Sequence, residues 1–421
     1  MKNGAMQKHK LARVRWQMGQ TLLPEHFLIQ EEALEAELRL RVELSGLPSY
    51  GVGRLSWNET LLAQGSLSIS SLTAVMPGGE LVDVPGNATL QPFSLEGTGK
   101  ASVSVYLHLL SEPRSAEGIA LYTNDPPVVQ RTIHRLHLSL EPVIDGAVAS
   151  LKLAVLTKNM EGIWRLEGTW VPPLLLVGSN PFLDELLRDL DLLLEHAHHL
   201  LLTQVSDSYL RIGRLNNARR TLCEVYRLQA MRADMKRHVY PHPYHLFEAL
   251  RRLYFEQSCY LEALPDERMP FYQHDDLVQS LGGWMKLLSQ GFRPEDSRSS
   301  HQPFTYRDGL FVLSPFPSDV QAAGETYLLV QRKDLGERLP MEGVKVASPS
   351  RLPVVRRLAL KGIPFRHIPY PEFPHAFSQE IDWYQLSHAE EWQYALREDG
   401  VAFYTTPALE GSKISLFWRK A

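Results

Sequence analysis

The feature that most constrains the fold is a leucine-rich segment near the middle of the chain. Between residues 183 and 200, apolar residues recur at alternating spacings of three and four, a heptad pattern typical of helices in bundles and coiled coils. The seam consists of Leu183, Leu186, Leu190, Leu193, Ala197 and Leu200. Further leucines at 187, 194 and 201 make this side wider than a two-stranded coil requires. We therefore expect the helix to pack in a bundle and also to meet copies of itself.

Three more segments with helical periodicity follow. Apolar residues recur at spacings of three and four within 215–225, 246–253 and 277–288. The first helix of the group is predicted to begin at residues 179–181, where an N-cap residue is followed by Pro181 at the first helical position. Four helices with short connections predict a helical bundle.

The region before this bundle, from about residue 47 to residue 177, has a different pattern. Short alternating segments are separated by turn residues at 66–76, 80–84, 101–110, 135–140, 150–156 and 163–166. In the clearest segment, 101–110, four apolar residues share one face: Val103, Val105, Leu107 and Leu109. Short strands without a long helix between them predict an antiparallel β-sandwich rather than a parallel sheet.

The N-terminal segment from Val14 to Leu44 contains another helical pattern. Pro24 suits a first helical turn, because its fixed φ matches that turn and its missing N–H is not needed there. Beyond Phe27, apolar residues recur at spacings of three and four at Ile29, Ala33, Ala36 and Leu40. We expect this helix to pack on the sandwich, with Phe27 filling the crevice between them.

The last part of the chain, residues 301–421, has short strand patterns and one basic helical stretch within 349–360. Arg351, Arg356 and Arg357 on that stretch either contact an acidic partner or belong to an ordinary solvated helix face. The polar segment 291–301 predicts a hinge before this part. The fold class is therefore multidomain α+β, with an N-terminal domain at 1–177, a helical domain at 178–292 and a small mixed α/β domain at 301–421.

Composition excludes several classes of protein. The chain has 421 residues, a net charge of −4 and a pI near 6.5, which argues against binding to nucleic acid. Cys223 and Cys259 cannot form a disulfide framework, which fits a reducing cytoplasm. There is no secretion-signal pattern, and the most apolar run, 170–177, is too short to cross a bilayer. We expect a cytoplasmic protein without direct membrane insertion.

Residues that could carry catalysis, a cofactor or a metal are few. The segment 97–102 departs from a phosphate loop, because Ser94 and Ala101 stand at two of its required positions. His196, His198 and His199 form either a metal site or, as we favour, a solvated histidine-rich face. His242, His245 and His274 flank prolines or helix starts and are expected to be capping or turn residues. We therefore predict no enzyme, no cofactor and no metal, although a site built from scattered residues stays open.

Several motifs resemble one family of bacterial proteins. The sequence WQMGQTLLPEHF at 16–27, followed by a helix rich in Gln and Glu, is similar to the N-terminal signature of TssK, ImpJ or VasE, the baseplate subunits of type VI secretion. The family's next blocks resemble residues 50–53 with 57–59, 75–79, 82–85 and 170–173 with 180–181. Its C-terminal domain resembles residues 345–352 and 365–369. In residues 1–12 and 113–134 we find no motif that resembles the family.

The resemblance implies a homotrimer with an N-terminal shoulder, a helical neck and a C-terminal head, similar in fold to receptor-binding proteins of tailed phages. It implies that the wedge proteins TssF and TssG hold the shoulder. It also implies that the head contacts TssL and TssM at the inner face of the inner membrane. The heptad seam then becomes a trimer seam, and Arg351, Arg356 and Arg357 become the membrane-complex interface. The predicted wedge interface consists of Arg15, Trp16, Gln17, Leu22, Leu23 and Pro24.

Two other classes of function stay open. A phage-like receptor-binding or tail adaptor protein would share the shoulder and neck, but its terminal domain would bind a saccharide or a cell surface. A hydrolase with a dispersed site would show a deep cleft that holds carboxylates or histidines with displaced pKa values.

Overall fold

The computed structural model describes residues 9–97, 99–111, 114–115, 131–206, 212–292, 301–332, 338–369, 371, 373, 375 and 377–419. The predicted hinge at 291–301 lies largely outside this part of the chain. Contacts divide the chain into two compact units, each described by itself. The first unit contains residues 1–195, 224–258 and 263–290, and the second contains residues 196–223, 259–262 and 291–421.

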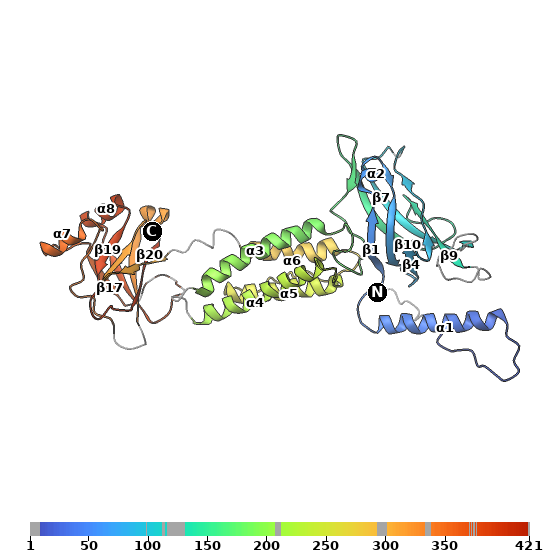
Figure 1. The fold of residues 1–421 in the computed structure, drawn as a ribbon, viewed down its shortest axis with the longest axis horizontal. Helices are drawn as coiled ribbons and strands as arrows, with labels where there is room; N and C mark the ends of the chain where they lie inside the picture. The colour runs from blue at the N-terminus through green and yellow to red at the C-terminus, as the bar shows by residue number, and fades with distance from the viewer. Residues whose placement is uncertain are drawn as a thin grey trace. The chain divides into compact units, whose positions relative to one another are not determined.

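The strand-rich part of the first unit contains a three-stranded and a six-stranded sheet (Figure 1). The three-stranded sheet has the order β1 (Gly51–Trp57), β3 (Ile69–Val75) and β4 (Leu81–Val84). The larger sheet has the order β11 (Trp164–Leu166), β10 (Ala147–Lys158), β7 (Ser102–Leu110), β9 (Thr132–Ser139) and β5 (Ala88–Thr89), with β8 (Arg114–Ser115) also paired to β9. A short pair, β2 (Ser66–Leu67) and β6 (Phe93–Ser94), and the helix α2 (Glu59–Ala63) complete this part. Neighbouring strands pair antiparallel except β5 and β9, which are parallel.

The predicted strands are confirmed at the level of individual residues. On β7, the four apolar side chains predicted to share one face are all buried. Two of the predicted segments form a hairpin, with β3 and β4 in antiparallel register from Leu72–Val84 to Val75–Leu81.

Two motif blocks that are far apart in sequence meet at β1. The N–H of Val52 donates to the carbonyl of Pro173 over 2.8 Å, and a Cβ on Gly51 would lie only 2.3 Å from that carbonyl oxygen. Position 51 therefore requires glycine.

Four helices follow: α3 (Asp184–Ser206), α4 (Ile212–Met235), α5 (Pro243–Tyr260) and α6 (Leu277–Gly291). The predicted start of the first was wrong. Asn180 does not cap a helix; its side chain accepts from the N–H of Phe182 and donates to the carbonyl of Leu176. Leu183 then takes a positive φ of 64°, so the chain turns once more before α3 begins at Asp184.

The second unit contains two more antiparallel sheets. The five-stranded sheet has the order β12 (His301–Pro303), β20 (Lys413–Arg419), β15 (Glu325–Gln331), β18 (Ile381–Leu386) and β17 (Phe365–Ile368). The four-stranded sheet has the order β13 (Thr305–Arg307), β14 (Leu310–Leu313), β19 (Val401–Tyr404) and β16 (Val346–Ala347). The short helices are η2 (Ser318–Ala322), α7 (Leu352–Arg357) and α8 (Glu390–Arg397). A core that includes Phe311, Val330, Trp392 and Phe403 holds these elements together. The basic helix was predicted, whereas β18 and α8 were not.

Candidate partner-binding surfaces

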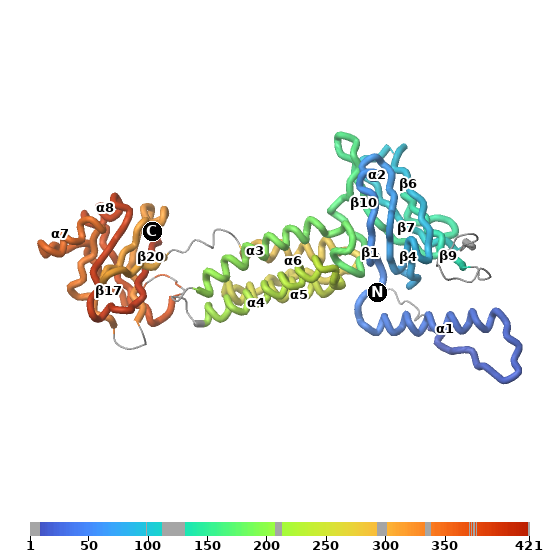
Figure 2. The backbone as a smooth tube through the Cα atoms, in the orientation of Figure 1, coloured from blue at the N-terminus to red at the C-terminus, as the bar shows by residue number. Residues whose placement is uncertain are grey.

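The N-terminal lead-in, which we define as residues 9–23, turns back onto the helix that follows it (Figure 2). That helix, α1, spans Pro24–Glu43. The turn passes through Gly19 at a φ of 78°, a conformation that favours glycine. Leu23 at the N-cap has no capping side chain, and the ring of His26 caps the helix instead, because the N–H of Leu23 donates to its Nδ1 over 3.2 Å. The motif at 16–27 thus forms an ordered turn followed by a capped helix N-terminus.

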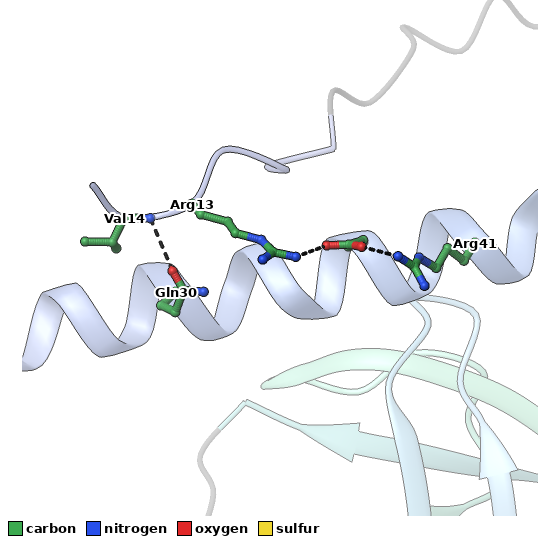
Figure 3. Close-up of polar contacts among 5 residues, drawn as sticks. Arg13, Val14, Gln30 and Arg41 are labelled. Carbon is green, nitrogen blue, oxygen red and sulfur yellow. Dashed lines mark hydrogen bonds and ion pairs between the residues drawn. The ribbon is translucent and has the colours of Figure 1, made fainter. Parts of the chain in front are cut away.

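The lead-in is held along α1 by ion pairs and a hydrogen bond. Lys10 pairs with Glu32 at 2.9 Å, and the N–H of Val14 donates to Gln30 Oε1 over 3.3 Å. Glu37 lies between Arg13 and Arg41, at 2.5 Å from each (Figure 3). The hydrogen bond and charge of Arg13, reinforced by Arg41, hold the pKa of Glu37 below its ordinary value. These contacts preorganise the lead-in on the helix.

All six residues of the predicted wedge interface lie on this turn. Trp16 packs against His26 and Phe27, with ring centroids 5.8 and 5.9 Å apart, and still has 46% of its surface exposed. Leu22 and Leu23 are also exposed. The other three members are exposed as well, namely Arg15, Gln17 and Pro24. The turn brings aromatic, aliphatic and cationic groups together on one surface.

The predicted burial of α1 was wrong. Phe27, expected to fill a crevice against the sandwich, is 55% exposed, and Ala33 is the only residue of α1 that is buried among those described. The contact of α1 with the sheets includes Arg39, which lies 3.7 Å from Glu80 beside the β3–β4 turn. The sheets therefore leave most of the helix uncovered.

The buried side of α3 is rotated relative to the predicted seam. Leu183, Leu190, Ala197 and Leu200 are buried, as are the widening leucines at 187, 194 and 201. Leu186 and Leu193 are only partly buried, although they belong to the predicted seam. The chain's own packing therefore uses the side of Leu187 and Leu194. Leu186 and Leu193 lie at its edge.

The sequence did not predict the role of His242 and His274. Nε2 of His274 donates to the carbonyl of Tyr50 over 2.8 Å, and Nε2 of His242 donates to the carbonyl of Pro48 over 3.1 Å. The two rings stack with centroids 5.5 Å apart. They therefore hold the segment that joins α1 to β1. His242 was expected to be a turn residue, and its Nδ1 does accept from the N–H of Tyr244.

The environment keeps these histidines neutral. Burial lowers the pKa of His242 to about 4, assisted by the neighbouring His274, whose own pKa burial also lowers. Tyr272 Oη lies 2.8 Å from Nδ1 of His274, and Tyr50 Oη donates to Asp275 over 2.6 Å. Burial raises the pKa of both tyrosines. The only sequence signals were the clustered aromatic and histidine residues around 240–245 and 271–275.

The three arginines of the predicted membrane-complex interface have different environments. Arg351 forms a bidentate pair with Glu391 at 2.8 and 3.1 Å and stacks on Tyr394. Arg356 lies over the ring of Tyr404. Arg357 is exposed and forms no ion pair within the described residues. Arg351, at the N-cap of α7, therefore contacts other parts of the same domain, whereas Arg357 on the helix stays available to a partner.

A cleft of about 470 Å³ lies between the end of the strand-rich part and the start of α3, against α6. Trp170, Phe182 and Met285 line it together with Asp184, whose pKa is raised by burial. The described lining also includes Glu167, Glu185 and Asp189 but no histidine, serine or cysteine, so it offers carboxylates and lacks the Ser–His or Cys–His pair of nucleophilic hydrolysis. Across the described ranges, no three metal-binding side chains gather in one place. Nor does any helix in them have the length and apolarity to cross a membrane.

Comparison with known proteins gives consistent results over the whole chain. A family model described as "Bacterial Type VI secretion, VC_A0110, EvfL, ImpJ, VasE" matches residues 26–127 and 120–418. The type VI secretion system baseplate component TssK1 of Pseudomonas aeruginosa (strain PAO1) is 25% identical over 443 residues, which cover 96% of this chain and 98% of TssK1.

Two solved structures extend the likeness to the fold. A crystal structure of TssK has a TM-score of 0.55 at 20% identity and covers 98% of this chain and 100% of its own. A chain of the TssK-TssF-TssG baseplate subcomplex, determined by cryo-electron microscopy, has a TM-score of 0.53 at 20% identity and covers 67% of this chain and 98% of its own. At this level of identity the likeness establishes a shared fold.

Proposed function

The chain belongs to the bacterial type VI secretion family that includes ImpJ and VasE, and we propose that it is the adaptor that links a TssF/TssG wedge to a TssL/TssM membrane complex. The family comprises structural baseplate components and not enzymes. The observation that carries the proposal is the extent of the match, because nearly the whole chain aligns with nearly the whole of a baseplate component. The solved TssK-TssF-TssG subcomplex supports the choice of TssF and TssG as partners.

The lead-in is the proposed wedge-binding surface of this adaptor. Trp16, Leu22 and Leu23 stay exposed although the turn around them is preorganised by His26 and Gly19. Exposed aromatic anchors on a rigid frame dominate many protein interfaces, because little conformational entropy is lost when they are buried. Arg15, Gln17 and Pro24 supply the polar rim of the same surface.

We assign the domain roles as shoulder 1–177, neck 178–292 and head 301–421, in a cytoplasmic homotrimer. The partly buried Leu186 and Leu193 on the edge of α3 support a seam between copies. In the head, the exposed residues Arg357 and Val354 lie on α7, and the exposed Leu358 follows at its C-cap. This pairing of charge and apolar surface suits contact with an acidic, partly apolar surface of TssL or TssM.

A pull-down with purified TssF and TssG tests the shoulder assignment. Trp16→Ala is expected to weaken wedge binding at least tenfold, since truncation of an anchor aromatic removes a large buried area (about 1.4 kcal/mol or more). Val143→Ala is the control, because Val143 is also exposed and apolar but lies between β9 and β10. Equal binding by Trp16→Ala at normal oligomeric mass would remove Trp16 from the interface. Failure of the wild-type chain to bind the wedge would contradict the proposed function itself.

The head assignment has its own test. A chain truncated after Gly291 is expected to retain the wedge and lose TssL, because it lacks residues 301–421. Retained binding to TssL would contradict the division of roles.

A further inference from the structure

Helix α1 has two apolar sides, and the structure covers only part of one of them. On the first side Ala33 is buried and Ala36 and Leu40 are partly buried, whereas Ile29 is 49% exposed. A second side carries Phe27, Leu34, Leu38 and Val42, at successive spacings of seven, four and four. We call this second set the outer stripe. All four of its residues are exposed, with fractions of 44% at Leu34 and 63% at Leu38.

The shape of the outer stripe fits a partner helix. Spacings of seven and four keep side chains on one helical face, where they act as knobs for the holes of a facing helix. The stripe spans residues 27 to 42, four turns of helix or about 24 Å. Such a length suits an amphipathic helix laid along α1, the mode in which apolar anchors recur at helical spacing. Phe27 also packs on Trp16, so the stripe continues the surface of the lead-in.

One carboxylate interrupts the outer stripe. Glu31 lies between Phe27 and Leu34 on the same face of the helix. Neighbouring glutamates are paired, Glu32 with Lys10 and Glu37 with Arg13, whereas Glu31 forms no ion pair within the described residues. Covering an unpaired carboxylate with an apolar surface is costly unless a cation accompanies it. The occupant of the stripe must therefore bring a lysine or an arginine to Glu31.

Charge also argues against a second copy of α1 as the occupant. Between Glu25 and Leu38 the helix carries five glutamates and no lysine or arginine. Parallel copies around a threefold axis would place Glu31 against Glu31, and like charges at such a position disfavour assembly.

We propose that the outer stripe of α1 docks an amphipathic helix of a wedge protein, with a basic side chain of that helix opposite Glu31. This inference rests on the proposed function, because it takes TssF and TssG as the partners. It adds the secondary structure and the charge pattern of the segment that binds.

The test uses the full chain with purified TssF and TssG. Photocrosslinking from p-benzoylphenylalanine at position 34 is expected to capture a segment that has apolar residues at helical spacing and at least one lysine or arginine. In a binding titration, Glu31→Arg is expected to lower affinity for the wedge at least tenfold. Glu161→Arg, with the same charge change at an exposed turn between β10 and β11, is the control and should stay within twofold of wild type.

The outcomes separate this inference from the proposed function. Normal wedge binding by Glu31→Arg and by a Leu34→Ser, Leu38→Ser double variant would overturn the stripe while the lead-in interface stands. A crosslink between two copies of this chain, or a change of oligomeric mass in those variants, would identify a second copy as the occupant and overturn the inference. Absence of wedge binding by the wild-type chain would contradict the proposed function, and the stripe assignment with it.

Discussion

Helices α1 and α3 carry similar apolar periodicity and bury it to opposite extents. On α3, Leu187, Leu190 and Leu194 are at most 4% exposed, whereas on α1 Phe27, Leu34 and Leu38 are at least 44% exposed. Both patterns indicate a helix with an apolar side that needs cover. Periodicity does not specify which chain provides that cover. The contrast indicates that α3 belongs to the chain's own core, and we infer that α1 is covered by another molecule.

The strongest test of this contrast places one substitution on each helix. Leu190→Asp is expected to lower the free energy of unfolding by about 4 kcal/mol or more, because it creates a cavity and buries a carboxylate in a fully buried site. Leu38→Asp should change it by less than about 0.5 kcal/mol, as for an ordinary surface substitution. Urea denaturation of the two variants measures both. Similar losses from the two would mean that α1 is already covered in the isolated protein.

The next test concerns the edge of α3. Because Leu190 is buried within the chain, its substitution cannot separate assembly from folding, but Leu186 and Leu193 are only partly buried. A Leu186→Asp, Leu193→Asp double variant is expected to lose the trimer in light scattering and keep its helical circular dichroism. Leu192→Asp, at an exposed position on the same helix, is the control. A double variant that stays trimeric would show that the seam lies elsewhere.

Local patterns predicted much of the fold, because they act over a few residues. Alternation on β7 and the 3–4 spacing on α6 each identified side chains that are buried in the structure. The start of α3 was missed because the side chain of Asn180 bonds to Leu176 and Phe182 instead of capping a helix. The side chain of an asparagine can form either a helix cap or a local turn, and the surrounding structure determines which of the two forms.

The sequence predicted the exposure of some surface residues but not of others. The six lead-in residues are exposed as a wedge interface would require. The outer stripe of α1 was not predicted, because the pattern through Ile29 and Ala33 lies on the opposite side of the helix. The contacts of His242 and His274 span about 190 and 220 residues of sequence to reach Pro48 and Tyr50. No periodicity encodes such a contact.

Acid should weaken the attachment of α1 at its C-terminal end. His242 has an ordinary pKa of 6.5 when unfolded and about 4 when folded, because burial disfavours its charged form. The unfolded chain therefore binds the proton first. Stability from the neutral ring is complete above pH 6.5 and declines as the pH falls toward 4, by an amount on the order of 1 to 2 kcal/mol after allowance for partial exposure. Denaturation at several pH values measures this slope.

A pair of variants assigns the slope to this site. His242→Asn is expected to reduce this slope between pH 6.5 and 4, since one titrating ring is gone, while the buried His274 keeps its own contribution. His199→Asn, at an exposed position on α3, should leave it unchanged. An unaltered slope in His242→Asn would place the acid sensitivity elsewhere in the chain.

The smallest expected effect concerns two arginines at α7. One of them is bound within its own domain, and the other is exposed and free to meet a partner. Arg351 is bound by Glu391 and Tyr394, so Arg351→Ala should lower the thermal midpoint of the protein by about 2 °C. Arg357→Ala should leave the midpoint unchanged, because its side chain has no ion pair to lose within the described residues. Binding to purified TssL should show the reverse order, with the larger loss in Arg357→Ala. A midpoint lowered by Arg357→Ala, with TssL binding intact, would mean that this cation supports the fold and not a partner.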